Sequence, residues 1–309
     1  MLDLILDSLR VVSLPTKTNF RGINHREVAL FQGPQGWAEF SPFLEYSDEE
    51  SSHWLACAIE AATQAPPRLY RSSIAVNATL PALNGESEIA KILAGFPGCT
   101  TIKIKVGTNE EEDLARIATV RKLNPQAKIR IDVNGLWSVD QASKFLERCG
   151  EIEYVEQPCA SVEELRELKS RVDVKIVGDE ILRKSTNPFE VDLKGAIDIL
   201  MLKVQPLGGI ANAHALAAHH KLPVVVSSAL ESAVGINYGL TLAASFQELS
   251  FDCGLATGSL LASNVAELPI VDGKMQITRL EPNFDGLEVS ADRFEWWKNR
   301  IMRTAALLG

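Results

Sequence analysis

Charged residues recur at a nearly constant spacing through the middle of the 309-residue chain, each close to the end of a short apolar run. Asp132, Glu156, Asp179 and Lys203 lie 24, 23 and 24 positions apart, and Lys105 falls near the end of the run before Asp132. An unpaired charge is costly to bury in an apolar strand. We therefore interpret the five residues as one functional cluster. The alternative is that each acid pairs with a lysine only to stabilise the fold.

Three carboxylates from neighbouring strands would form a site made entirely of oxygen ligands. Such a site suits a hard divalent cation. Mg²⁺ fits best because it keeps coordination positions for water or substrate, with Mn²⁺ as a substitute. In Lys103-Ile104-Lys105 the two lysines share one face of a strand, because strand side chains alternate. Their like charge lowers the pKa of the less solvated lysine, which can then act as a base near neutral pH.

A base and a second cation, Lys203, on opposite sides of a metal site indicate a class of reaction. A substrate carboxylate bound to the metal makes the neighbouring C–H group more acidic, since the ion and a lysine neutralise the charge left by proton removal. Elimination, racemisation and cycloisomerisation all begin with this step. The spacing of the residues does not choose among them.

The apolar runs form the repeating pattern that would position these side chains. Eight β-rich runs cover residues 74–80, 101–106, 129–133, 153–156, 174–179, 197–204, 223–228 and 252–256. Capping boxes predict helix starts at Thr108, Ser138 and Ser161. Asn187 followed by Pro188 predicts another. This period is typical of a TIM barrel, whose catalytic residues lie at the C-terminal ends of the strands. A doubly wound open sheet is the competing topology, but no G-x-G-x-x-G follows a strand.

The two ends of the chain differ from this repeat. Residues 1–70 contain β-like stretches at 4–14 and 26–31, a glycine-rich turn at 33–36, and a helix capped by Ser47 and Glu50. Residues 262–309 add a β-like stretch at 274–280 and an aromatic end. Neither segment is large enough to form a good core alone. We expect them to meet as one α+β capping domain over a barrel of residues 71–261.

Composition and charge exclude several classes of protein. The net charge is −9 with a pI near 5.2, so the chain would repel nucleic acid and anionic membranes. The five cysteines lack Cys-x-x-Cys spacing, which argues against a disulfide framework or a zinc site. No apolar run approaches the roughly 20 residues of a membrane helix, and the acidic start is unlike a signal peptide. We expect a cytoplasmic enzyme with a small-molecule substrate and neither a nucleic-acid nor a membrane partner.

Several motifs extend the evidence over nearly the whole chain. These motifs are GWAEFSPF, VNATLPA, TIKIKVG, IRIDVNGLWS, YVEQP, VGDE, LMLKVQPLGGI and LPIVDGKMQI. With them the chain resembles the enolase superfamily, in the subgroup with a lysine on each side of the metal, to which muconate cycloisomerase belongs. The resemblance implies a modified TIM barrel of the (β/α)7β type with an α+β cap. The short length and the segment VVVSSALESAVGI are most similar to the dehydratases of menaquinone and phylloquinone biosynthesis.

The resemblance also implies a role for each member of the cluster. Lys105 would abstract the α-proton and then protonate the departing hydroxyl group. Lys203 would stabilise the enediolate, with its ammonium stacked on the substrate ring. The metal ligands would be Asp132, Glu156 and Asp179.

Other polar residues near the strand ends are candidates for supporting roles. Lys103 shares the strand face of the base, and Asn134 lies two positions beyond a metal ligand, on the same face. Ser227 and Ser228 would offer hydroxyl groups to the distal carboxylate of the substrate. The alternative is that the two serines belong to a loop that only caps the next helix.

Three further features are less specific. The loop at residues 15–24 is either a lid over the site, with Phe20 or Arg21 against the ligand, or a solvated hairpin connection. Glu180 points away from Asp179 and is expected to form a structural ion pair. The histidines at 214, 219 and 220 lie away from the strand ends, which disfavours a histidine base.

Rival functions remain open from the residues alone. A dipeptide or N-acylamino-acid epimerase or racemase would use both lysines as a two-base pair. Dipeptide epimerases carry Asp-x-Asp at the eighth strand, where this chain has Asp252-Cys253-Gly254. Racemisation of N-acylamino acids is not excluded by this difference. A catalytically silent barrel would lack a ligand or a lysine, and none is missing.

Overall fold

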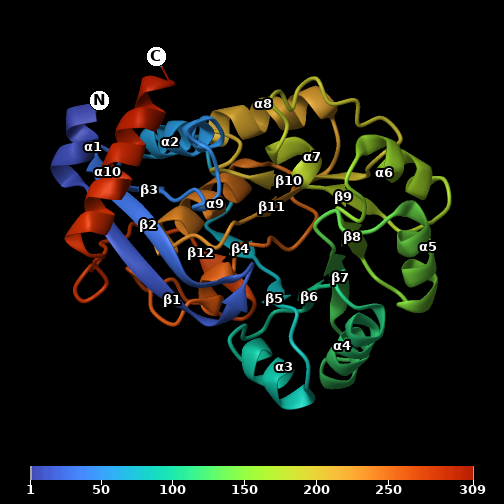
Figure 1. The fold of residues 1–309 in the computed structure, drawn as a ribbon. Coiled ribbons are helices and arrows are strands. Elements are labelled where there is room, and N and C mark those ends of the chain that lie inside the picture. Colours follow the sequence, from blue (N-terminus) through green and yellow to red (C-terminus); the bar gives the residue numbers. More distant parts are fainter. Residues whose placement is uncertain (1, 309) are drawn as a thin grey trace.

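The computed structural model describes residues 2–308, which form a capping part beside a barrel (Figure 1). Three strands of the capping part pair antiparallel in the order β1-β2-β3. The elements are β1 (Arg10–Phe20), β2 (Ile23–Gly33), β3 (Gly36–Phe40), α1 (Leu2–Ser8), α2 (Asp48–Thr63) and α10 (Ala291–Ala306). Helix α10 contacts both α1 and α2, so the last helix of the chain packs on the first segment.

The capping sheet buries both of its faces. Val12 pairs with Val28 across β1 and β2, and both belong to the large apolar cluster that continues into the barrel. The next pair, Val11 with Ala29, belongs to a separate cluster with α2 and α10. Because side chains alternate along a strand, one face of the sheet packs on the barrel and the other on the helices.

Seven parallel strands form the barrel sheet in the order β11-β10-β9-β8-β7-β6-β5. The strands are β5 (Ala78–Leu80), β6 (Thr101–Lys105), β7 (Lys128–Asp132), β8 (Tyr154–Glu156), β9 (Ile176–Gly178), β10 (Ile199–Lys203) and β11 (Val224–Ser227). The helices are α3 (Glu86–Leu93), α4 (Glu110–Leu123), α5 (Val139–Arg148), α6 (Val162–Lys169), α7 (Glu180–Arg183), α8 (Ile210–His220), α9 (Ala233–Ser245) and the 3₁₀ helix η1 (Thr257–Leu260). Neighbours in space are neighbours in sequence, as in a TIM barrel. The predicted fold class is therefore confirmed.

The eighth predicted run, residues 252–256, contributes isolated bridges instead of a strand. Cys253 forms a parallel bridge with Val76, next to β5, and Gly254 forms one with Ser227 at the end of β11. The run thus joins the two edges of the sheet and closes the barrel. Glycine suits this position, because a Cβ atom on residue 254 would collide with the Ser227 Oγ.

Two predicted strands differ in extent from the observed ones. The first run, residues 74–80, divides into β5 and the short strand β4 (Ser73–Ala75). The stretch predicted at 274–280 shortens to β12 (Lys274–Gln276), which pairs antiparallel with β4 and not with the capping sheet. β12 and β4 therefore form a two-stranded sheet that is separate from the seven-stranded sheet of the barrel.

The prediction of a strand over residues 4–14 is wrong for its first half. Residues 2–8 form helix α1, and β1 begins only at Arg10. Leu2, Leu4, Ile5 and Leu6 of this helix all pack into the capping cluster, with Ile5 buried, and Leu9 adds to the cluster just after the helix ends.

Two helix starts were also predicted wrongly. Helix α4 begins one residue later than expected, because Asn109 is the cap and accepts from the N–H of Glu112. No helix follows Asn187-Pro188, where the Asn187 side chain closes a turn by accepting from the N–H of Phe189. The other capping boxes are confirmed: Ser47 with Glu50, Ser138 with Gln141 and Ser161 with Glu164.

Carboxylates of the capping part hold the starts of two barrel helices. Glu60 on α2 accepts hydrogen bonds from the N–H groups of Ile210 (2.5 Å) and Ala211 (3.3 Å) in the first turn of α8. Glu39 at the end of β3 accepts from the N–H of Gly235 (2.9 Å) in the first turn of α9. A carboxylate is favourable there because unpaired N–H groups and the helix dipole both attract negative charge.

Among the described residues, no helix has the length and apolar character to span a bilayer.

Candidate active site

The register of the parallel strands brings the predicted residues together. Lys105, Asp132 and Glu156 are direct neighbours across β6, β7 and β8. Asp179 follows β9, and Lys203 ends β10. All five side chains therefore lie at the C-terminal ends of the strands, the end at which TIM-barrel enzymes bind their substrates.

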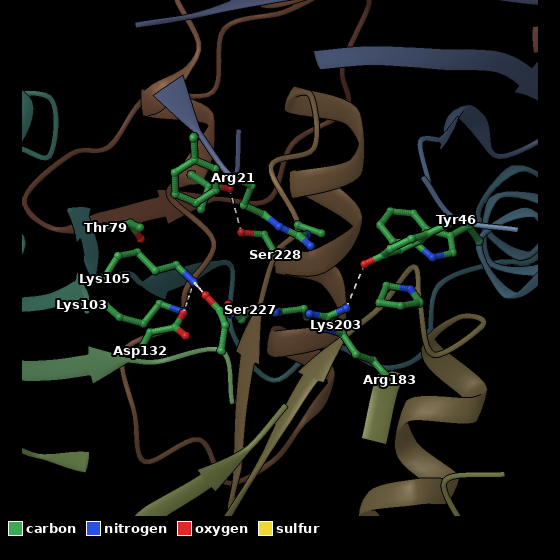
Figure 2. Close-up of a pocket in the computed structure, with 16 residues that line it drawn as sticks. Arg21, Tyr46, Thr79, Lys103, Lys105, Asp132, Arg183, Lys203, Ser227 and Ser228 are labelled. Carbon is green, nitrogen blue, oxygen red and sulfur yellow. Dashed lines mark hydrogen bonds and ion pairs between the residues drawn. The ribbon is translucent and has the colours of Figure 1, made fainter. Parts of the chain in front are cut away.

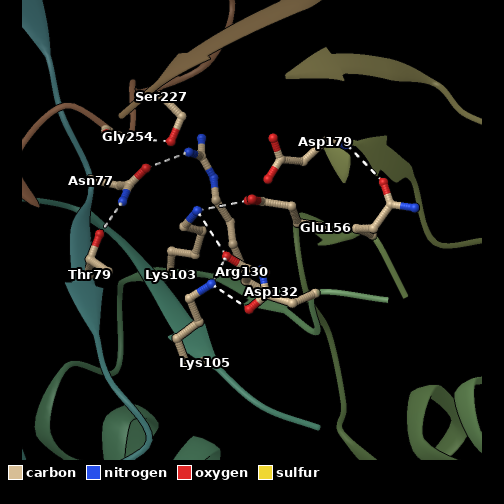
Figure 3. A network of polar contacts seen from close by, with 12 residues as sticks. Asn77, Thr79, Lys103, Lys105, Arg130, Asp132, Glu156, Asp179, Ser227 and Gly254 are labelled. Atoms are coloured by element: carbon tan, nitrogen blue, oxygen red, sulfur yellow. Dashed lines mark hydrogen bonds and ion pairs between the residues drawn. The ribbon is translucent and has the colours of Figure 1, made fainter. Parts of the chain in front are cut away.

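Each of the three carboxylates is paired with a lysine, and Figure 3 shows the pairs on β6, β7 and β8. Lys105 Nζ lies 2.5 Å from Asp132 Oδ2, and Lys203 Nζ lies 2.5 Å from Asp179 Oδ2. Lys103 Nζ bridges two acids, at 2.8 Å from Glu156 Oε2 and 3.2 Å from Asp132 Oδ2. As predicted, the two lysines of β6 share one face of the strand.

The pKa values of the two lysines of β6 are shifted in opposite directions. Burial lowers the pKa of Lys105, and the charge of Lys103 lowers it further, so that the attraction of Asp132 is outweighed. Burial also disfavours the charged form of Lys103, but the two acids that it bridges, Glu156 first, raise its pKa well above the usual range. Of the pair, Lys105 is therefore the one that gives up its proton more readily.

The acids also differ from one another. Burial opposes ionisation of Asp132, but Lys105 and Lys103 hold its pKa well below the ordinary value. Asp179 behaves in the same way, with Lys203 as its main partner. Burial raises the pKa of Glu156 to about 7, and the nearby Asp132 adds to this effect. Without a bound metal ion, Glu156 is thus less readily ionised than Asp132 and Asp179.

Two orphaned oxygens indicate that the acids fit a metal ion. Asp132 Oδ1 and Glu156 Oε1 are buried and have no hydrogen-bond partner in the described part of the chain. Such atoms are costly to leave unpaired, and a divalent cation between β7 and β8 would satisfy both. No group of three acid, histidine or cysteine side chains within residues 2–308 is gathered tightly enough to hold an ion as it stands. In this arrangement the other oxygens of Asp132 and Glu156 accept hydrogen bonds from Lys105 and Lys103.

Asn134 connects Lys105 to the ion pair of Glu180 and Arg183. Its backbone lies in the left-handed region (φ 55°), and its Oδ1 accepts from Lys105 Nζ at 2.8 Å. Its Nδ2 donates to Glu180 Oε1 at 3.1 Å. Glu180 forms the predicted ion pair, with Arg183 at 2.5 Å. The expected reason, strand alternation, is wrong, because β9 ends at Gly178, Glu180 begins helix α7, and Arg183 contacts Asp179 as well.

Sequence reasoning missed Arg183 and its partner Tyr46. The Arg183 guanidinium lies 3.2 Å from Asp179 and receives a contact from the capping part, because its Nη1 donates to the Tyr46 hydroxyl at 2.9 Å. Figure 2 shows both side chains at the pocket with Lys203. The signal was weak: Arg183 follows Asp179 by four positions, the spacing of an ion pair on a helix. Trp54 and Thr79 also line the pocket and were not predicted.

Ser227 and Ser228 lie in the wall of the same pocket. The Ser228 hydroxyl donates to the Gly254 carbonyl oxygen at 2.5 Å and lies 2.8 Å from the Thr257 hydroxyl. The Ser227 hydroxyl is 3.4 Å from the same carbonyl, a much weaker contact.

The pocket also includes Phe20 and Arg21, at the tip of the β1–β2 hairpin. The loop predicted at residues 15–24 is therefore a hairpin whose tip reaches the site.

Two solved structures show that this fold occurs in other enzymes. The L-Ala-D/L-Glu epimerase from Bacillus subtilis is 22% identical, with a TM-score of 0.74 over 91% of this chain and 98% of that chain. Muconate lactonizing enzyme from Pseudomonas putida is 20% identical, with a TM-score of 0.72 over 93% of this chain and 97% of that chain. At these identities the likeness concerns the fold alone.

Family models and curated relatives are more specific. The model "Enolase N-terminal domain-like" matches residues 11–62, and "Enolase C-terminal domain-like" matches residues 88–289, so the fold and site define an enolase-like enzyme. The o-succinylbenzoate synthase of Mycobacterium ulcerans (strain Agy99) is 46% identical over 98% of this chain and 95% of that protein. The one of Mycobacterium tuberculosis (strain ATCC 25618 / H37Rv) is 45% identical over 99% and 96%. The chain therefore belongs to the o-succinylbenzoate synthase family of the enolase superfamily.

Proposed function

We propose that the chain converts 2-succinyl-6-hydroxy-2,4-cyclohexadiene-1-carboxylate to 2-succinylbenzoate with loss of water. The enzyme is a lyase, and the reaction is a step of menaquinone biosynthesis or of its phylloquinone counterpart. The observation that carries the proposal is the 45–46% identity to o-succinylbenzoate synthases over 98–99% of the chain. The lysine–carboxylate cluster supplies the groups that this dehydration needs.

Asp132, Glu156 and Asp179 would hold a divalent cation, for which we propose Mg²⁺, with Mn²⁺ as a substitute. When bound, the ion neutralises charge that develops on the substrate carboxylate and so makes the α-proton more acidic. The support is the all-oxygen donor set and the two unpaired carboxylate oxygens on β7 and β8.

Lys105 takes the α-proton at its Nζ, since its lowered pKa makes the neutral amine accessible. The same Nζ then returns the proton to the departing hydroxyl group as the C–O bond breaks. Water leaves, the ring becomes aromatic, and Lys105 ends neutral again. Asn134 orients Lys105 through the hydrogen bond at 2.8 Å. Lys203 keeps its ammonium on the other side of the substrate, where it stabilises the negative charge that forms during proton removal.

The remaining predicted residues have positioning roles. Lys103 holds Glu156 and Asp132 in place, and its charge depresses the pKa of Lys105. Ser227 and Ser228 form the polar wall near the distal carboxylate of the substrate. We also propose the division predicted from the sequence, with residues 1–70 and 262–309 as the capping domain and 71–261 as the barrel. The packing of α10 on α1 and α2 supports it. The cytoplasm is the proposed compartment.

An ultraviolet assay of 2-succinylbenzoate formation tests this function. Purified enzyme with Mg²⁺ is expected to dehydrate the cyclohexadiene precursor, and chelation by EDTA is expected to stop the reaction. Racemisation of N-succinylamino acids is measured in parallel. Racemase activity without any dehydration would contradict the proposal.

A further inference from the structure

A chain of hydrogen bonds leads from Lys105 to the other side of the pocket. Lys105 Nζ donates to Asn134 Oδ1 at 2.8 Å, and Asn134 Nδ2 donates to Glu180 Oε1 at 3.1 Å. The same Oε1 accepts from Arg183 Nη2 at 2.5 Å, and Arg183 Nη1 donates to the Tyr46 hydroxyl at 2.9 Å. Lys105 and Arg183 lie on opposite sides of the pocket in Figure 2. The chain of contacts therefore joins two walls of the site.

Asparagine is suited to the middle of this chain. A lysine ammonium only donates hydrogen bonds, and an ionised carboxylate only accepts them. The Asn134 amide offers one end to each, with its oxygen toward Lys105 and its nitrogen toward Glu180. A reversed amide would present N–H groups to the lysine and an oxygen to the carboxylate, and both contacts would be repulsive. Glu180 thus favours the orientation in which Asn134 accepts from Lys105.

The backbone around Asn134 is fixed, so only its side chain needs to be oriented. Its left-handed φ of 55° is a conformation that asparagine adopts more readily than most residues. The next N–H, of Gly135, donates to the Gln157 carbonyl oxygen at 2.6 Å. Asn134 lines both the substrate pocket and a second, open hollow of about 320 Å³ beside it, which Glu180 also lines. Without Glu180 the amide would have room to rotate toward this hollow.

The orientation of Asn134 matters because it helps to set the direction in which Lys105 takes a proton. Lys105 Nζ lies 2.5 Å from Asp132 Oδ2 and 2.8 Å from Asn134 Oδ1. A neutral amine has two N–H groups and one lone pair, and these two acceptors engage both N–H groups. The lone pair then points away from both of them. A base held in one productive orientation reacts faster than one that samples several.

We propose that Glu180 is a positioning residue for the proton transfer, which fixes the amide of Asn134 and, through it, the Nζ of Lys105, while Arg183 holds Glu180 in place. This inference rests on the proposed function, because it requires that Lys105 is the base. Since Glu180 acts through Asn134, its loss should slow proton transfer and leave substrate binding nearly unchanged.

Steady-state dehydration by the Mg²⁺-loaded enzyme tests whether Glu180 acts through Asn134. Glu180→Ala is expected to lower kcat by about 10- to 100-fold and to change KM by less than about threefold. Asn134→Ala should lower kcat at least as much. In the double variant the two losses should not multiply, so that its kcat stays within about twofold of that of Asn134→Ala. Multiplied losses would mean that Glu180 acts independently of Asn134 and would overturn the inference.

Glu180→Gln separates the contact with Asn134 from the ion pair with Arg183. Glutamine keeps an oxygen for the Asn134 N–H group but removes the negative charge, so kcat is expected to stay within about fivefold of wild type. Calorimetry without substrate should give a Mg²⁺ affinity within about threefold of wild type for Glu180→Ala and Glu180→Gln. Glu190→Ala, at an exposed position, is the control and should change neither kcat nor Mg²⁺ affinity.

Two results of this comparison would overturn the inference. A loss of kcat in Glu180→Gln as large as in Glu180→Ala would mean that the ion pair with Arg183 is what matters. A loss of Mg²⁺ affinity that matches the loss of kcat would mean that Glu180 acts on the neighbouring Asp179.

The outcomes also distinguish this inference from the proposed function. If wild type dehydrates the precursor and Lys105→Ala does not, but Glu180→Ala retains the wild-type kcat, the inference alone is wrong. If wild type does not dehydrate the precursor, the proposed function fails, and the inference fails with it.

Discussion

Glu231 is expected to make the folded protein less stable as the pH rises through neutrality. Its carboxyl group is buried in the loop between β11 and α9, and this burial, together with the neighbouring Glu39, raises its pKa to about 7. One oxygen accepts from the N–H of Ala229 at 2.5 Å. In the unfolded chain the ordinary pKa of 4.5 applies.

The sign and size of the effect follow from these two pKa values. Because the folded state binds the proton more tightly, the stabilisation is complete below the unfolded pKa and is lost as the pH rises through about 7. Each pKa unit corresponds to about 1.4 kcal/mol. Relative to a fully protonated Glu231, ionisation therefore lowers the free energy of unfolding by at most about 3 kcal/mol at pH 8 and about 1 kcal/mol at pH 5. Glu231→Gln removes the ionisation and keeps an oxygen for Ala229. Its stability relative to wild type should therefore rise by about 2 kcal/mol between pH 5 and pH 8.

Urea unfolding followed by tryptophan fluorescence measures this difference at the two pH values. Glu248→Gln, at an exposed position, serves as the control and should show no pH-dependent gain. A Glu231→Gln effect that is the same at pH 5 and pH 8 would refute the reasoning, because it would mean that Glu231 titrates alike in both states.

Three further substitutions test the site and the fold. Lys105→Ala should reduce dehydration by about 10²- to 10⁴-fold and abolish exchange of the substrate α-proton in D₂O, followed by ¹H NMR; normal exchange would rule out Lys105 as the base. Glu60→Gln should lower the free energy of unfolding by about 1–2 kcal/mol, because the first turn of α8 loses a charged acceptor, whereas Glu248→Gln, at an exposed position outside any helix, should not. Gly254→Ala should lower the free energy of unfolding by about 1–3 kcal/mol, because the added methyl group overpacks against Ser227. Thermal melts measure the loss. Gly258→Ala is the control that should be tolerated, because the nearest atom to its new Cβ is 3.6 Å away.

The position of the charged cluster was predictable because a parallel barrel converts regular spacing into adjacency. Asp132 and Glu156 are 24 positions apart in sequence, but the register makes them direct neighbours. Lys103 and Lys105 could likewise be assigned to one face from the alternation of strand side chains. The capping boxes at Ser138 and Ser161 were predictable because they depend on residues only three positions apart.

Other features depend on contacts that sequence periodicity does not encode. Arg183 lies on a four-residue helix, and its partner Tyr46 comes from the capping part, 137 positions away. The eighth apolar run resembles a strand, but its pairing stops after the bridges at Cys253 and Gly254. Helix α1 was mistaken for a strand because its apolar residues at the chain start fit either period over so short a segment.

The capping part imposes an order on folding during synthesis. Its core needs helix α10, where the indole N–H of Trp297 donates to Glu27 across 270 positions of sequence. At typical rates of translation, Glu27 leaves the ribosome roughly 15 to 50 seconds before Trp297 does. Throughout that interval the apolar face of β1 and β2 that α10 later helps to cover stays incompletely buried, while the barrel strands emerge in sequence order. A nascent chain of this protein thus carries a capping sheet with one incompletely covered face until α10 has been made.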